Sequence, residues 1–382
     1  MKTTFLFVAQ FAALAGLAIA QQPPPSVQSP EVHPDHSVIF RLRDPNAQKV
    51  TVTIAGRPDP VTLTKGEDGV WSVTSEPMAP DTYSYSFHAD GVSMLDPSNS
   101  AIVPNLLSPS SVLVVPGPEP LPWDRTAIPH GVIHHHFYKS GIVGDSRDYY
   151  VYTPPGYDPA AHKRYPVLYL LHGYSDDARA WTAVGYANLI LDGLIAQGKA
   201  KPMIIVMPLG YGDPDIVNKQ FLAKSGSPFR NADTRSKNFD RFTDALLKEV
   251  IPMVDKEYRT VNKRESRAIA GLSMGGAETL LTGLNHLDTF AWVASFSAGG
   301  EANDFATEFP KLDAATANKQ LRLLWIACGT DDRLITLNRS LVDWLKSKEI
   351  NVTRIETPGM HAWVVWRRNL TALAPLLFAA GT

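Results

Sequence analysis

The chain has 382 residues, of which 44% are hydrophobic and 19% are charged, as in an ordinary globular protein and unlike a disordered or fibrous one. Its 36 basic and 38 acidic residues give a formal net charge of −2, which argues against a nucleic-acid partner. A chain of this length can form two domains with sizeable cores.

The first 20 residues have the pattern of a secretory signal peptide. Lys2 gives a basic start, residues 5–17 are mostly apolar, and Ala18-Ile19-Ala20 forms a small-residue cleavage motif. We expect cleavage after Ala20, export to the periplasm or the medium, and no membrane association afterwards. The alternative, an uncleaved anchor, fits less well because the apolar run is short for a membrane-spanning helix.

Short alternating segments follow a linker at residues 21–30 that is rich in Pro, Gln and Ser. The segments are separated by Pro, Gly and Asp, and their period of two predicts an antiparallel β-sandwich over residues 31–117. Tyr83, Tyr85 and Phe87 alternate onto one face, and we interpret them as core and not as a sugar-stacking platform. The expected strands are 37–43, 49–56, 69–75 and 81–90.

The hydrophobicity pattern is different in residues 123–382, where continuous apolar segments alternate with amphipathic ones. This pattern predicts an α/β domain with a doubly wound, mostly parallel sheet. Cys328, the one cysteine of the chain, ends an apolar run, so we expect a buried thiol and no internal disulfide. Strands are expected within 164–173, 202–210, 266–273, 290–299, 321–329 and 352–359, and helices within 183–198, 239–258, 336–348 and 363–378, with another helix starting at 274.

A G-x-S-x-G motif is formed by Gly271, Ser273 and Gly275 at the end of an expected strand. This is the pattern of a sharp strand-to-helix turn with a nucleophilic serine at its tip. A serine nucleophile needs a base held by an acid, in the chain order Ser, acid, His for this fold. Asp331 and Asp332 follow one later strand and His361 follows the next, so we predict a catalytic triad. A structural histidine and aspartates that cap a helix are the alternatives.

Acyl transfer also requires hydrogen-bond donors for the oxyanion. The backbone N–H of Met274, directly after the nucleophile, is the first expected donor. The second is the backbone N–H of Tyr174, because Gly173 lets the chain approach the substrate closely. His172 precedes that glycine, and we predict a supporting role for it.

The segment 211–240 is too long and polar for a routine connection, so we predict a lid or specificity loop, with a disordered insertion as the alternative. Its aromatic residues and others could provide substrate-binding surface. Because Trp363 and Trp366 lie three positions apart, at least one of them is expected in the core. The substrate-binding candidates are Gly173, Trp181, Tyr211, Phe221 and Trp363.

Three consecutive histidines at 134–136 raise the question of a metal site. Adjacent side chains of a strand point to opposite faces, so the three cannot chelate one ion. His134 and His136 share a face but lack an obvious third ligand. We therefore predict no metal site, and the proposed serine mechanism needs no cofactor.

Several motifs together resemble carbohydrate esterase family one, particularly bacterial feruloyl and acetylxylan esterases. The resemblance covers about residues 123–380 and implies an α/β-hydrolase fold with Ser273 as nucleophile, His361 as base and Asp332 as acid. Residues 31–117 resemble the immunoglobulin-like module of carbohydrate-binding module family forty-eight, which in such esterases contributes structure or part of the pocket. The motifs are YYVYTPPGYD, PVLYLLHGYSDD, IVMPLGYGD, IAGLSMGGAETL, CGTDD and GMHAWVVWRRNL.

The resulting hypothesis is a secreted serine esterase that cleaves feruloyl, or other hydroxycinnamoyl, esters from plant cell-wall xylan through an acyl-enzyme. Its expected partner is feruloylated xylan or a xylo-oligosaccharide. Alternatives within the fold are an acetylxylan esterase and an enterochelin-type siderophore esterase. A non-catalytic carbohydrate-binding protein is the alternative from another class.

Overall fold

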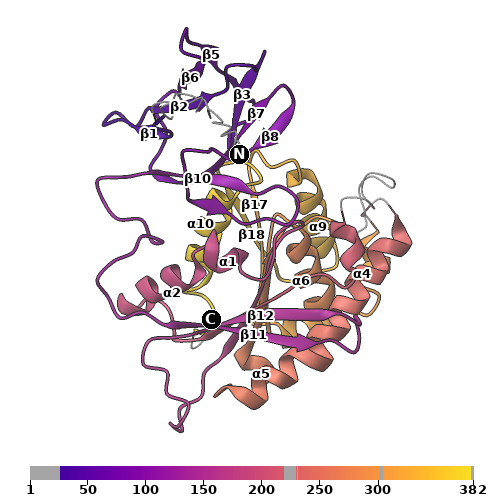
Figure 1. Ribbon diagram of the computed structural model, residues 1–382. Coiled ribbons are helices and arrows are strands. Elements are labelled where there is room, and N and C mark those ends of the chain that lie inside the picture. The colour runs from indigo at the N-terminus through magenta and orange to yellow at the C-terminus, as the bar shows by residue number, and fades with distance from the viewer. Residues whose placement is uncertain (1–25, 219–228, 230, 301–303, 380–382) are drawn as a thin grey trace, which may run out of the picture.

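The computed structural model describes residues 26–218, 229, 231–300 and 304–379. The expected signal peptide, the first part of the linker and the candidate Phe221 lie outside the described residues. Strands of the N-terminal region, indigo to purple in Figure 1, lie beside one end of a larger part in which helices surround a single sheet. Among the described residues, no helix combines the length and the apolar character needed to cross a membrane.

The N-terminal region consists of two antiparallel sheets with a common core. Side chains of the strands alternate between buried and half-buried positions, and Tyr85 and Phe87 face inward while Tyr83 is half-buried. Phe40 packs edge-on against Tyr85, with ring centroids 5.0 Å apart. One sheet has the order β1 (Glu31–Val32), β2 (Val38–Arg43), β6 (Val70–Thr74), β5 (Thr64–Lys65), and the other β4 (Val61–Thr62), β3 (Val50–Ile54), β7 (Asp81–Ala89), β10 (Ser110–Val115), β9 (Ile102–Val103), with β8 (Val92–Met94) beside β7.

Among the described residues, the larger sheet has eight strands, and it forms the centre of the α/β part. The pairs β11·β12 and β12·β14 are antiparallel, whereas the other five pairs are parallel. In parallel sheets the carboxyl ends of the strands meet at one edge, where functional side chains gather. The order is β11 (Val132–Lys139), β12 (Ser146–Thr153), β14 (Ile204–Pro208), β13 (Val167–Leu171), β15 (Arg267–Leu272), β16 (Trp292–Phe296), β17 (Leu323–Gly329), β18 (Thr353–Thr357).

Helices cover both faces of this sheet, and each face has its own apolar core. On one face pack α1 (Ala180–Ala183), α2 (Ala187–Ala196) and α10 (Trp363–Leu373). On the other pack α4 (Ala232–Ala245), α5 (Ile251–Glu257), α6 (Met274–Asn285), α7 (Phe305–Glu308), α8 (Ala314–Gln320) and α9 (Ile335–Ser347). The other helical turns within the described residues with stated bounds are η1 (Pro214–Val217), η3 (Leu246–Val250) and η4 (Arg264–Ser266).

The last part of the segment 211–240 differs from the loop that the sequence predicts, while residues 219–228 and 230 of this segment lie outside the described residues. This last part belongs to α4, which begins at Ala232 and not near residue 239. The side chain of Asn231 caps this helix by accepting a hydrogen bond from the backbone N–H of Thr234. The first turns of α4 contain no buried apolar residue before Phe239, so hydrophobic periodicity could not reveal them.

Candidate active site

Ser273 lies at the sharp turn between β15 and α6. Its backbone φ of 52° falls in a region that non-glycine residues rarely adopt. A Cβ atom at Gly271 would lie 2.3 Å from the carbonyl oxygen of Gly275, and one at Gly275 would lie 2.5 Å from that of His172. Both glycines are therefore required by close backbone packing, and this turn projects Ser273 from the edge of the sheet.

Three side chains from separate strand ends form a hydrogen-bonded chain. His361 Nε2 lies 3.0 Å from Ser273 Oγ, and His361 Nδ1 lies 2.8 Å from Asp332 Oδ2. When the imidazole carries its proton on Nδ1, this N–H donates a hydrogen bond to Asp332. The unprotonated Nε2 then faces the serine hydroxyl. Asp332 follows β17 and His361 follows β18, so the parallel register brings both to Ser273.

Asp332 is buried, and its surroundings favour the charged carboxylate. Burial alone would raise its pKa, but the hydrogen bond and charge of His361, the Leu334 N–H and the Ser297 hydroxyl together hold the pKa below its usual value. Asp331, its neighbour, is exposed and accepts a hydrogen bond from Thr330 Oγ1. Asp332 thus contacts His361, and Asp331 does not.

The loop after β13 lies against the serine. A Cβ atom at Gly173 would be 3.4 Å from Ser273 Cβ, so the backbone of Gly173 and Tyr174 borders Ser273. Buried His172 fixes this segment, since its Nδ1 lies 2.8 Å from the Gly173 carbonyl and its Nε2 accepts the Gly210 N–H at 2.8 Å. Burial lowers the pKa of His172, as expected of a neutral ring with one donor and one acceptor.

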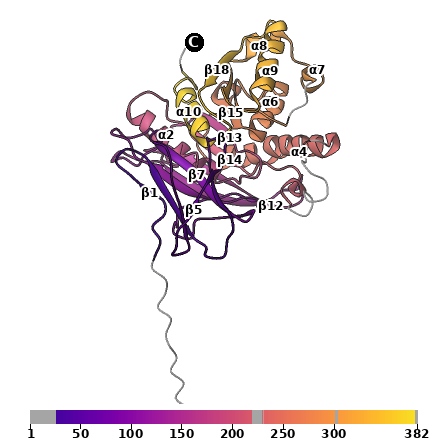
Figure 2. The same ribbon diagram turned by 90° about the horizontal axis from the view of Figure 1, so that it is seen from above.

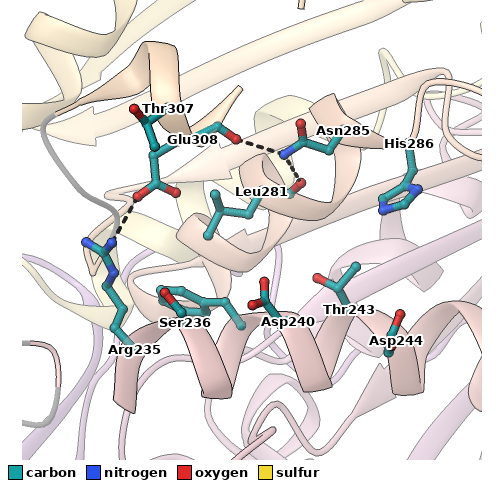
Figure 3. A pocket seen from close by; sticks show the side chains of 11 residues that line it. Arg235, Ser236, Asp240, Thr243, Asp244, Leu281, Asn285, His286, Thr307 and Glu308 are labelled. Atoms are coloured by element: carbon teal, nitrogen blue, oxygen red, sulfur yellow. Dashed lines mark hydrogen bonds and ion pairs between the residues drawn. The ribbon is translucent and has the colours of Figure 1, made fainter. Parts of the chain in front are cut away.

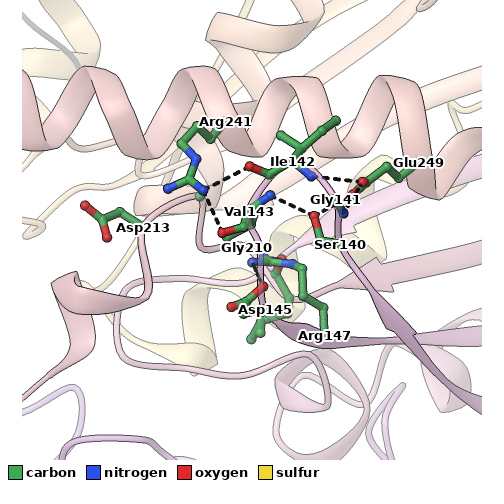
Figure 4. A network of polar contacts seen from close by, with 12 residues as sticks. Ser140, Gly141, Ile142, Val143, Asp145, Arg147, Gly210, Asp213, Arg241 and Glu249 are labelled. Carbon is green, nitrogen blue, oxygen red and sulfur yellow. Dashed lines mark hydrogen bonds and ion pairs between the residues drawn. The ribbon is translucent and has the colours of Figure 1, made fainter.

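The Gly210 segment is itself tied to the first hairpin of the sheet. Arg147 of β12 donates to the Leu209 carbonyl at 2.6 Å, and Figure 4 shows Arg147 beside Gly210. The turn after β11 is held by Glu249, which accepts hydrogen bonds from the Ser140 hydroxyl and the Gly141 N–H, while Arg241 donates to nearby carbonyls. This network positions the backbone that His172 contacts.

A cavity of about 340 Å³ opens at Ser273 and is lined by both parts of the chain. Trp363 borders it from α10, and Arg333 borders it as an exposed side chain without an ion pair among the described residues. The N-terminal region contributes Ala55, Ser84, Val103, Asn105, Ser108 and Ser110, and the α/β part contributes Gly173, Tyr174, Ser175, Asp176, Leu272, Ser273, Arg333, His361, Ala362, Trp363 and Trp366.

Two of the predicted substrate-binding residues do not line this cavity. Trp181 is fully buried, donates to the Leu171 carbonyl and packs beneath Trp363. Tyr211 is also buried, where its hydroxyl donates to the Asp176 carbonyl. Both are corrections of the sequence prediction, because aromatic residues near the strand ends serve here as core. Gly173 and Trp363 do line the cavity.

A second, larger cavity of about 500 Å³ lies between α4, α6 and α7, away from Ser273. Its lining is polar, and Arg235 forms an ion pair with Glu308 across it (Figure 3). Burial and the nearby Asp244 raise the pKa of Asp240 on its wall. Nothing in it resembles the Ser273 arrangement, which remains the candidate site.

The three consecutive histidines point to different faces of β11. His134 and His136 stack with ring centroids 6.5 Å apart, whereas His135 stacks on Tyr150 and lies 2.8 Å from Asp148. Within the described part of the chain, no group of three or more His, Cys, Asp or Glu side chains could hold a metal ion.

Comparison with known proteins identifies the family to which the chain belongs. Residues 140–377 match the Esterase family, described as "Putative esterase". The chain belongs to this family. Membership places it among the carboxylic ester hydrolases.

Individual relatives agree with this assignment. The chain is 30% identical over 361 residues to an "Endo-1,4-beta-xylanase/feruloyl esterase" of Xylanibacter ruminicola, covering 93% of this chain but 46% of that protein, so it spans about half of that relative. Its fold is similar to a ferulic acid esterase from Anaeromyces mucronatus (23% identity, TM-score 0.56, 67% and 93% coverage) and to the enterobactin esterase from Shigella flexneri (19%, 0.65, 90% and 94%).

Proposed function

We propose that the protein is a serine esterase that cleaves feruloyl or related hydroxycinnamoyl esters of plant cell-wall xylan. The observation that supports ester hydrolysis most directly is the chain from Asp332 through His361 to Ser273, at the wall of a cavity. The feruloyl group is suggested by the name of the Xylanibacter ruminicola relative. Trp363 offers an aromatic surface in the cavity, against which a cinnamoyl ring can pack.

The proposed reaction has two stages. His361 Nε2 accepts the proton of Ser273 Oγ as this oxygen attacks the ester carbonyl, and the same proton then passes to the leaving alcohol. Next, a water molecule gives a proton to His361 Nε2 as it attacks the acyl carbonyl. The bond from this carbon to Ser273 Oγ then breaks, Oγ takes the proton from His361, and the acid is released. The backbone N–H groups of Met274 and Tyr174 stabilise the oxyanion in both stages. Asp332 holds the imidazole and stabilises its positive charge.

The proposal has further parts that rest on the sequence. The doubly wound α/β-hydrolase architecture of residues 123–382, the immunoglobulin-like module at 31–117 and export by a signal peptide belong to it. We expect the exported protein to begin at Gln21. N-terminal sequencing of the protein from the medium or periplasm checks this expectation.

A catecholate siderophore ester is the second candidate substrate. The exposed Arg333 on the cavity wall, without an ion pair among the described residues, favours it, because a guanidinium group binds anionic oxygen atoms well. Ferulate esters of neutral sugars carry no such charge.

One kinetic comparison separates the candidates. We expect the kcat/KM for methyl ferulate to exceed the values for acetylated xylan and for a cyclic catecholate trilactone. The Ser273→Ala variant, which controls for contaminating esterases, should lose the activity. Highest kcat/KM on acetylated xylan or on the trilactone would contradict the feruloyl assignment, and no turnover of any ester would contradict esterase function.

A further inference from the structure

The N-terminal region contacts the loop that carries Tyr174. In the β9–β10 connection, the Asn105 side-chain amide donates to Ser175 Oγ at 2.9 Å and to Asp176 Oδ1 at 3.1 Å. The backbone N–H of Leu106 donates to the Ser175 carbonyl at 2.7 Å. Three hydrogen bonds thus join this connection to the two residues directly after Tyr174.

Ser175 needs such support because its backbone is strained. Its φ of 69° lies in the left-handed region, which costs a non-glycine residue of order 1 kcal/mol or more and persists only when the surroundings enforce it. From within the α/β part, Asp176 N–H donates to the Gly173 carbonyl, and Tyr211 holds the Asp176 carbonyl. Among the described residues, the hydrogen bonds to Ser175 itself come from Asn105 and Leu106.

Asn105 is held in one orientation by its own turn. Its Oδ1 accepts the backbone N–H groups of Leu107 and Ser108 at 3.0 and 2.9 Å. Since the oxygen is used in this way, the amide nitrogen is directed at Ser175 and Asp176. The side chain therefore acts as a rigid link from one part of the chain to the other.

We infer that Asn105 is a positioning residue for ester hydrolysis, which holds Ser175 in its left-handed conformation and thereby directs the Tyr174 N–H toward the oxyanion. The N-terminal region is then part of the catalytic apparatus, independent of any binding to carbohydrate. The inference rests on the proposed function only in requiring ester hydrolysis by Ser273 with Tyr174 as a donor, and not on the identity of the acyl group.

The test variant is Asn105→Asp, because aspartate keeps the Oδ1 acceptor of the turn but removes both donors and faces Asp176. We expect kcat for p-nitrophenyl acetate and for methyl ferulate to fall roughly 10- to 100-fold, since loss of a complete oxyanion donor costs about 10²–10³-fold. KM should stay within about twofold, because the donor acts mainly in the transition state.

A matched control breaks another contact between the same two parts of the chain. Arg368 forms an ion pair with Asp81 of β7 at 3.0 Å, and its side chain is 42% exposed. Arg368→Gln should leave kcat within about twofold of wild type. Asn105→Ala, which adds no charge, should reduce kcat in the same direction as Asn105→Asp and serves if the aspartate variant does not fold.

Specific results would overturn the inference. They are an unchanged kcat in a folded Asn105 variant, a rise in KM without a change in kcat, or an equal loss of kcat in Arg368→Gln. The first result would show that the Tyr174 N–H is positioned without Asn105. The second would show that Asn105 affects only substrate binding. The third would show that any weakening of the interface between the two parts lowers kcat. Failure of the feruloyl assignment leaves the test intact, because p-nitrophenyl acetate reports ester hydrolysis alone.

Discussion

At the residue scale, the two adjacent aspartates after β17 have different surroundings. Asp332 is buried and hydrogen-bonded to His361, whereas Asp331 is exposed. We predict that Asp332→Asn lowers kcat by up to about 10⁴-fold, because asparagine favours the wrong imidazole tautomer. Asp331→Asn should keep kcat within about twofold. Steady-state kinetics of both purified variants check this, and a larger loss in Asp331→Asn would exchange their roles.

Glu278 is a second residue with a testable electrostatic effect. It is fully buried on α6, neither carboxyl oxygen has a hydrogen-bond partner within the described residues, and burial raises its pKa well above the usual value. The folded protein therefore keeps a proton that the unfolded chain releases above pH about 4.5. Its contribution to stability is complete below that pH and decreases as pH rises toward the folded-state pKa.

Glu278→Gln removes this loss, because glutamine stays neutral. At pH 7 the cost of keeping the carboxyl protonated is at most about 3 kcal/mol. We expect the stability of the variant, relative to wild type, to increase as the pH rises from 4.5 to 7.5. Urea unfolding at both pH values measures this difference. Glu67→Gln, at an exposed position, is the control and should show no such gain. An identical pH dependence in the Glu278→Gln and wild-type proteins would contradict the buried, protonated carboxyl.

The sequence could identify the residues of the Ser273 arrangement because Ser273 and Asp332 follow apolar strands and His361 follows one further strand, in the chain order Ser, acid, His. Asn105 and Arg333 could not be found in this way. Asn105 contacts Asp176, 71 positions away, through packing of two separate parts of the chain. The prediction of Trp181 and Tyr211 as pocket residues is wrong. The sequence shows that these residues are aromatic, but it does not show whether an aromatic side chain near a strand end lines the pocket or packs in the core.

At the element scale, the turn from β15 to α6 depends on glycine. A Cβ at residue 275 would meet the carbonyl oxygens of His172 and Leu171 at 2.5 and 2.7 Å, and neither backbone group can yield without moving β13. We predict that Gly275→Ala lowers both the melting temperature and kcat, because the added atom displaces Ser273 and the neighbouring loop of Gly173 and Tyr174 together.

The matched substitution is Gly193→Ala in α2. There the nearest atom to a new Cβ is the Pro122 carbonyl oxygen at 3.8 Å, an ordinary contact. Alanine should stabilise this helix by about 0.5–1 kcal/mol without altering kcat. Thermal unfolding and kinetics of both variants give the comparison. If Gly275→Ala behaved like Gly193→Ala, the turn would have room that the structure does not show.

Elements with clear periodicity agree with the sequence prediction, while weakly patterned ones do not. β2, β3, β6 and β7 lie within or close to the segments that alternation indicates. The start of α4 was missed because its first turns are polar, and the short helices α7 and α8 were not predicted. Short helices depend on tertiary contacts more than on their own sequence.

At the scale of the whole molecule, the N-terminal region and the α/β part are joined beside the candidate site, and β7 lies next to α10, both of which are labelled in Figures 1 and 2. Besides the Asn105 contact, buried Arg367 of α10 donates to Asp81 Oδ1 at 2.7 Å and to the Thr82 carbonyl. Asp81 and Arg367 are 286 positions apart, so no local pattern could predict this pair. α10 begins two residues after His361, and the pair thereby connects the N-terminal region to His361 as well as to the loop that carries Tyr174.

The buried Asp81–Arg367 ion pair is predicted to contribute to the stability of the folded protein. Both side chains are excluded from solvent, and Arg367 also donates to the Val184 carbonyl and lies over the Trp123 ring. Asp81→Asn leaves the buried guanidinium charge without a counter-ion, which costs about 3–5 kcal/mol. We therefore expect a clearly lower melting temperature in circular dichroism. Arg368→Gln, which breaks the exposed ion pair to the same carboxylate, should cost at most about 1 kcal/mol. Combining Asp81→Asn with Arg367→Met removes the charge as well, so the double variant should be more stable than Asp81→Asn alone. Equal losses in Asp81→Asn and Arg368→Gln, or a double variant less stable than Asp81→Asn, would show that the buried pair does not hold the two parts together.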